Sequence, residues 1–112
     1  MTIDGTAADF GDLPVGFAVN AAQRLHTAEG LGFYVRQRGD AERGLLVLYF
    51  EDAATLVRQE RDFERDRLVW RTTPLPKDQA SEHLSRMSVR DPDLWIIEID
   101  GSLEKNPFVL LG

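Results

Sequence analysis

The run Leu45–Phe50 constrains the fold of this chain more than any other segment. All of its residues are hydrophobic, and successive side chains of a strand point to opposite faces of a sheet. A strand of this kind is expected at the centre of a sheet, with both of its faces covered. The rest of the chain must therefore supply a layer of structure on each side of it.

Two segments have the apolar spacing of helices. The first predicts a helix over about residues 14–29, with a proline in its first turn and Gly30 after its last turn. The second has a narrower apolar stripe and predicts a helix over about 77–89. This helix should end at Asp91-Pro92, because the residue before a proline is pushed out of the helical region.

Alternating apolar and polar residues, separated by turn residues, predict further strands. Their expected spans are 33–38, 55–60, 67–73 and 94–99. The polar, glycine-bounded segment 39–44 is typical of a hairpin connection, so we expect the strands before the second helix to form a meander. The last strand is nearly as apolar as Leu45–Phe50 and is expected inside the sheet.

The elements follow the order α-β-β-β-β-α-β. We therefore expect an α+β fold of two layers, in which two helices pack on a mostly antiparallel sheet of about five strands. Two short helices should cover only one face of that sheet. Its other face would depend on aromatic side chains, on the C-terminal tail or on a second copy of the chain, so homodimerisation is one hypothesis.

The two ends of the chain differ from its middle. Residues 1–12 are small and acidic, lack apolar periodicity, and predict a flexible leader before a single domain over 13–112. The tail 102–112 ends in Phe108-Val109-Leu110-Leu111, which is too apolar to remain in water without a reason. We expect this tail either to pack across the sheet or to bind a partner.

Composition and charge exclude several classes of protein. The chain of 112 residues has no cysteine, so it forms neither a disulfide nor a thiolate metal site. Its longest apolar run is far below the roughly 20 residues that span a bilayer, and its first residues do not resemble a secretory signal, so we expect a cytoplasmic protein without a membrane partner. The net charge is −6, and acids interleave with the arginines, which disfavours nucleic acid as a partner.

Two motifs resemble those of a known family. They are the turn Arg38-Gly39-Asp40-Ala41-Glu42-Arg43-Gly44 before an aliphatic strand, and the run Asp91-Pro92-Asp93-Leu94-Trp95-Ile96-Ile97-Glu98-Ile99. Together with the first helix, their order and separation resemble an uncharacterised family of alphaproteobacterial proteins, domain of unknown function 1491, over roughly residues 13–100. The resemblance implies one compact bacterial domain and transfers no activity, cofactor or functional residue.

Four carboxylates surround the last predicted strand: Asp91, Asp93, Glu98 and Asp100. Clustered carboxylates are the ligands that Mg²⁺ requires, so a metal-assisted hydrolase that uses the first three is one hypothesis. Acidic residues also mark the ends of helices and strands, and we favour this second interpretation, with no metal and no cofactor. His26 and His83 lie on different predicted helices without ligand partners at helical spacing, and we expect structural or surface roles for them.

Aromatic and basic side chains on one predicted sheet face form a candidate binding surface. They are Tyr34, Arg36, Arg38, Arg58 and Arg71. Arginine beside aromatic rings is typical of recognition hot spots, whereas cross-strand ion pairs would explain the same residues structurally. Trp70 and Trp95 fall at inward strand positions and are expected in the core.

The chain contains no nucleophile elbow, phosphate loop or dinucleotide fingerprint. We therefore expect a small non-enzymatic protein-binding or accessory domain, which acts through its open sheet face or through Phe108 and Leu110 of the tail. The metal-assisted hydrolase and weak nucleic-acid binding through the sheet arginines are the alternative functions.

Overall fold

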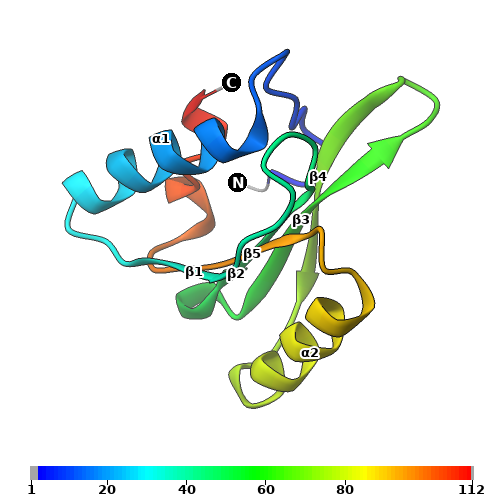
Figure 1. Ribbon diagram of the computed structural model, residues 1–112. Coiled ribbons are helices and arrows are strands. Elements are labelled where there is room, and N and C mark those ends of the chain that lie inside the picture. The colour runs from blue at the N-terminus through cyan, green and yellow to red at the C-terminus, as the bar shows by residue number, and fades with distance from the viewer. Residues whose placement is uncertain (1–2, 112) are drawn as a thin grey trace.

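The computed structural model describes residues 3–111 and contains a five-stranded sheet with a helix on each side (Figure 1). The strands are β1 (Phe33–Gln37), β2 (Leu46–Phe50), β3 (Thr55–Asp62), β4 (Arg67–Pro74) and β5 (Trp95–Ile99), and the helices are α1 (Val15–Ala28) and α2 (Lys77–Arg90). The predicted order of elements is confirmed. Among the described residues, no helix is long and apolar enough to cross a membrane.

The strand β2 lies at the centre of the sheet, whose order is β1-β5-β2-β3-β4. All of its residues are buried. Next to it lies β5, parallel to β2 with Leu48 beside Ile97, and antiparallel to β1 on its other side. The predictions of a central β2 and an internal β5 are confirmed, and the sheet is antiparallel except for this one pair.

The predicted hairpin between β1 and β2 is wrong, because β5 separates these strands. The connecting loop packs on the start of β5 instead. The backbone N–H of Asp40 donates to the carbonyl of Asp93 at 3.0 Å, and the indole N–H of Trp95 donates to the carbonyl of Asp40 at 2.8 Å. Gly39 and Gly44 are required here, since a Cβ on either would collide with the carbonyl oxygen of Asp93.

The two helices lie on opposite faces of the sheet, whereas the sequence predicts both on one face (Figure 1). Val15 and Val19 of α1 pack onto the face that carries Trp70 and Trp95. Leu84 of α2 is fully buried against the other face. The difference has a physical reason: β2 and β5 are apolar on both sides, so each side of the sheet needs its own cover.

The C-terminal tail completes the layer formed by α1. It contains two 3-10 turns, Leu103–Lys105 and Val109–Leu111, and carries Phe108 into the core, where the side chain is 1% exposed. The Phe108 ring centroid lies 6.1–6.3 Å from those of Phe10, Phe33 and Trp70. Of the two outcomes expected for the tail, Phe108 therefore shows the packed one, while the side chain of Leu110 lies outside the described residues.

Residues 3–10 run along β4, where the sequence predicts a flexible leader (Figure 1). Ala7 pairs with Val69, Ala8 is 2% exposed, and Phe10 packs against the core. Backbone hydrogen bonds hold this segment in place, and these bonds do not depend on the spacing of apolar residues. The prediction of a flexible leader relied on the lack of such spacing. Residues 1 and 2 of the predicted leader lie outside the described part of the chain.

Replacing Phe108 tests whether the tail belongs to the core. Phe108→Ala should lower the free energy of unfolding by about 3–5 kcal/mol, because a buried aromatic ring is lost and a cavity remains. Val109→Ala is the matched control, since that side chain is 41% exposed, and it should change stability by no more than about 0.5 kcal/mol. Urea denaturation of both variants measures the difference, and equal effects would contradict this role of the tail.

A pH titration tests the loop before β2. The carboxylate of Asp40 accepts the backbone N–H groups of Arg43 at 2.8 Å and Glu42 at 2.9 Å, and these bonds lower the pKa of Asp40 below its ordinary value. The stabilisation is complete above the unfolded pKa of about 3.9 and is lost as the pH falls through the lower folded pKa. The difference in Tm between the wild type and Asp40→Ala should therefore be constant near neutral pH and shrink below about pH 4. A difference that stays the same at acid pH would refute the assignment.

Candidate functional site

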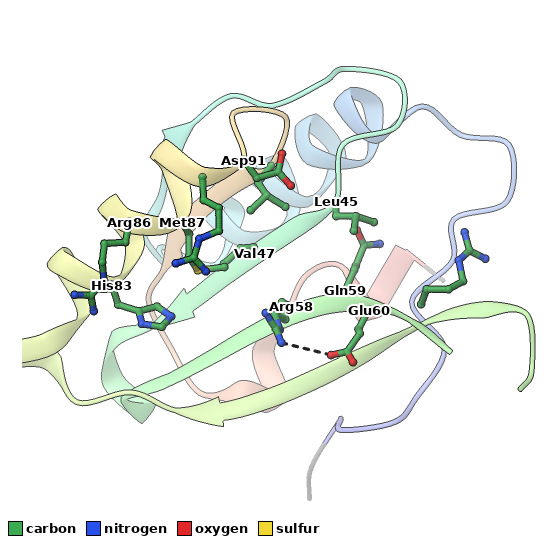
Figure 2. Close-up of a pocket in the computed structure, with 12 residues that line it drawn as sticks. Leu45, Val47, Arg58, Gln59, Glu60, His83, Arg86, Met87 and Asp91 are labelled. Carbon is green, nitrogen blue, oxygen red and sulfur yellow. Dashed lines mark ion pairs between the residues drawn. The ribbon is translucent and has the colours of Figure 1, made fainter. Parts of the chain in front are cut away.

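A groove of about 620 Å³ lies between α2 and the strands β2 and β3 (Figure 2). Four of its lining side chains are apolar: Leu45, Val47, Met87 and Leu94. The others are polar or charged and come from β3 and from α2 with its C-terminal end: Arg58, Gln59, Glu60, Arg61, His83, Arg86, Arg90 and Asp91. The groove thus combines an apolar lining with a mainly basic rim.

The groove forms where α2 stops covering β3. On the face of β3 that α2 approaches, Leu56 is buried, whereas Arg58 and Glu60 further along the strand are exposed. The opposite wall is one side of α2, because residues 83, 86, 87 and 90 follow helical spacing. Leu84 holds this helix against the sheet and thereby fixes the width of the groove.

The cations of the groove differ in how they are neutralised. Arg58 lies 3.7 Å from Glu60, Arg61 lies 3.8 Å from Asp66, and Arg86 lies 2.9 Å from Glu82, all of them exposed pairs. Exposed pairs of this kind are weak. The side chain of Arg90 makes no hydrogen bond or ion pair with any residue between 3 and 111, and the side chain of His83 makes none within the same span. The rim therefore keeps cationic capacity for a ligand.

Tyr49 fastens the segment that leads into α2. Its hydroxyl donates to the carbonyl oxygen of Leu75 at 2.8 Å, immediately before the helix. Burial raises the pKa of Tyr49, and nearby carboxylates, first among them Glu51, act in the same direction. The phenol therefore stays protonated and keeps donating to this carbonyl across the physiological pH range.

The structure separates the predicted sheet arginines. Arg58 and Arg71 are register partners on β3 and β4 and share one face. Arg36 is on β1, three strand spacings or about 14 Å from β3. Arg38 follows β1 and lies over the ring of Trp95, 5.1 Å from its centroid, on the opposite side of the sheet. Of this set, only Arg58 lines the groove.

Arg36 has a structural role at the edge of the sheet. Its guanidinium donates to the carbonyl and hydroxyl oxygens of Ser81 at 3.3 and 3.2 Å and to the hydroxyl of Ser85 at 3.1 Å. It also lies 3.6 Å from the carboxylate of Glu98. These contacts tie α2 to β1 and β5. Its neighbour Tyr34 is 63% exposed and remains the aromatic candidate on this strand.

The four predicted carboxylates do not meet. Asp91 and Asp93 precede β5, and Asp100 follows it, so about 16 Å of strand separates them. Glu98 is paired with Arg36. Within residues 3–111, no three His, Asp or Glu side chains are placed to hold a metal ion. Only Asp91 belongs to the groove.

The two histidines have different surroundings. His26 is 1% exposed, and its Nε2 lies 2.7 Å from the carbonyl oxygen of Asp100, a contact that requires the proton on Nε2. This bond joins α1 to the end of β5. His83 is half-buried and lines the groove.

Sequence reasoning missed most of the basic wall of the groove. His83, Arg86 and Arg90 are three and four residues apart and therefore share one side of the second predicted helix. This spacing was a usable signal, because the three residues flank the apolar stripe of the same helix. What the sequence lacked was the position of β3 relative to that side.

A sequence model for the family described as "Protein of unknown function (DUF1491)" matches residues 13–109. The chain belongs to the DUF1491 family. A search of curated proteins finds no significant match. The suspected family is therefore confirmed, and the family description carries no activity.

Solved structures resemble this DUF1491 chain in fold. A crystal structure of a DUF1491 family protein from Caulobacter crescentus CB15 is 20% identical, has a TM-score of 0.68, and the match covers 86% of this chain and 94% of that one. An NMR structure of a DUF1491 family protein from Caulobacter crescentus CB15 gives 0.69 at 20% identity, covering 87% and 92%. The solution structure of protein Atu0922 from A. tumefaciens gives 0.60 at 20% identity, covering 81% and 87%.

Removing the Arg36 side chain tests its structural role in this DUF1491 domain. Arg36→Ala should lower the free energy of unfolding by about 1–2 kcal/mol, because several charge-assisted hydrogen bonds to α2 are lost at a partly exposed site. Arg24→Ala is the matched control, since Arg24 is exposed on α1, and its effect should stay within about 0.5 kcal/mol. Chemical denaturation measures both, and a neutral Arg36→Ala would show that these contacts do not hold α2 in place.

Proposed function

We propose that this chain is a non-catalytic, cytoplasmic protein-binding domain, and that the groove between α2 and β3 holds an extended acidic segment of a partner protein. The observation that carries the proposal is the pairing of an apolar lining with a rim of arginines, of which Arg90 is unpaired among the described residues. Arginine beside apolar surface is the composition of protein-binding hot spots.

The size of the groove supports a segment rather than a large surface. Its volume of about 620 Å³ is within the range of sites that enclose a ligand of a few residues. Leu45, Val47 and Met87 offer apolar contact to alternate side chains of an extended peptide. The remaining side chains of such a peptide would face the rim.

Charge favours an acidic occupant. The whole chain has a net charge of −6, whereas the groove gathers four arginines against the carboxylates of Glu60 and Asp91. A local excess of cations on an acidic protein attracts anionic side chains and repels basic ones, which gives specificity more than affinity. The apolar lining then distinguishes a protein segment from a bare anion.

The separated carboxylates give no support to the metal-assisted hydrolase. Nucleic-acid binding through the sheet arginines also lacks support, because Arg36 lies three strand spacings from Arg58 and Arg38 lies on the other side of the sheet. A nucleic acid remains a distinguishable outcome of the test below.

A peptide titration tests the groove. The probe is a peptide of about six residues, roughly 20 Å when extended, with alternating Glu and Leu, compared with a peptide of alternating Lys and Leu. The Glu–Leu peptide should shift the backbone NMR signals of residues 58–61 and 83–91 of the full chain, and binding should weaken as salt is raised. The Lys–Leu peptide should have no effect at these residues.

Charge reversal provides the matched variants. Arg90→Glu should weaken binding of the Glu–Leu peptide by about tenfold, because one cation is replaced by a repelling charge. Arg24→Glu, on α1 and the opposite face of the sheet, should leave the affinity unchanged. Equal shifts with both peptides, shifts outside the groove, or tighter binding of a single-stranded oligonucleotide at the same residues would overturn the proposal.

A further inference from the structure

The outer edge of β4 is occupied by the chain's own N-terminal segment, residues 3–10 (Figure 1). Gly5 N–H donates to the carbonyl of Trp70 at 2.7 Å, and Trp70 N–H donates to the carbonyl of Thr6 at 2.9 Å. Ala8 N–H donates to the carbonyl of Leu68 at 2.9 Å. The segment therefore acts as an added antiparallel strand, although only Ala7 and Val69 form a regular bridge.

Two carboxylates complete this edge. Asp4 Oδ1 accepts the backbone N–H of Thr72 at 2.7 Å, and Asp9 Oδ2 accepts that of Leu68 at 3.1 Å. An ionised carboxylate only accepts hydrogen bonds, and its bonds to N–H groups are stronger than those of a neutral acceptor. The edge thus recognises acidic side chains five residues apart, which backbone pairing alone would not do.

A small residue is recognised between them. Ala8 is 2% exposed, and its carbonyl oxygen accepts the side-chain N–H of Gln59 at 2.9 Å. The other end of the Gln59 amide accepts the backbone N–H of Leu46 at 2.8 Å, so its orientation is fixed. Phe10 then packs near Phe108, with ring centroids 6.1 Å apart. The surface on β4 that receives residues 3–10, here called the seat, is therefore specific for a pattern of Asp, any three residues, Ala, Asp and an aromatic residue.

The segment can leave this seat without opening the sheet. It is joined to α1 through Gly11, whose φ is +63°. β4 keeps its full register with β3, from Thr55 beside Pro74 to Asp62 beside Arg67. Segments held at the edge of a sheet by a few solvent-exposed hydrogen bonds are among the parts of a fold that open at low cost. The seat also lies on β4 within the family match of residues 13–109, whereas the segment that fills it lies outside that match.

We propose that the outer edge of β4 is a strand-addition site for an extended acidic segment of a partner protein, and that the chain's own residues 3–10 are its intramolecular occupant. A partner that carries the same pattern displaces the segment and pairs with β4 by main-chain hydrogen bonds, with its two carboxylates on Leu68 and Thr72. The edge of β4 differs from the groove, which is lined mainly by β2, β3 and α2, although Gln59 contributes to both.

Binding in trans tests the proposal on the full chain. The probe is a labelled synthetic peptide of residues 3–12, and the receptor is the Ala8→Glu variant, whose own segment no longer fits its buried position. Fluorescence anisotropy should show the peptide binding this variant at least about tenfold more tightly than the wild type, in which the native segment competes. Hydrogen exchange should show new protection of the amides of Leu68, Trp70 and Thr72.

Matched peptides and a second receptor keep the test decisive. A peptide with Asn at both Asp positions should bind more weakly, and a peptide with Glu at the Ala8 position should not bind.

If Ala8→Glu does not fold, the Asp4→Asn, Asp9→Asn double variant of the full chain replaces it, because it keeps the packing and weakens only the carboxylate contacts. Lack of binding to a folded variant, equal binding to the wild type, or protection at residues 83–91 instead of 68–72 would overturn the strand-addition site without bearing on the Glu–Leu peptide result. Dimerisation of the folded variants without peptide would show that a second copy, and not a partner, takes the edge.

Discussion

The parallel contact between β2 and β5 is the constraint on which the rest of the structure depends. Both strands are apolar on both faces. Placed side by side, they make a sheet centre whose two faces must both be shielded from water. The chain covers one face with α1 and the C-terminal tail, and the other with α2. The segments that look peripheral in the sequence are therefore parts of the core, and Phe108 is the clearest case.

Much of the fold could be predicted from the sequence, because it depends on local patterns. Helical spacing and two-residue alternation located both helices and all the strands, and the uninterrupted apolar runs identified the two central strands. The insertion of β5 between β1 and β2 could not be predicted in this way. It depends on the close approach of Gly39 and Gly44 to Asp93, which are far apart in the sequence and show no joint signal in it.

The candidate site was less predictable than the fold. Arg58 and Asp91 were singled out from the sequence and line the groove, but the reasons given for them, an arginine-rich sheet face and a metal cluster, are not what the structure brings together. The basic side of α2 was visible as spacing. That this side of α2 lines a groove depends on where α2 stops covering β3, which is at Arg58. This position is set by tertiary packing.

The two edges of the sheet are protected by different means. β1 is short and has a register shift after Val35, which bends it away from regular pairing, whereas β4 is a long, regular strand. A long bare edge is the template on which identical chains stack into cross-β aggregates. Release of residues 3–10 would therefore expose the protein to aggregation for as long as β4 stayed bare. Any ligand of this edge must take the place of residues 3–10 as the strand paired with β4. Exchange at β4 therefore has to be the substitution of one strand by another, and not the release of residues 3–10 alone.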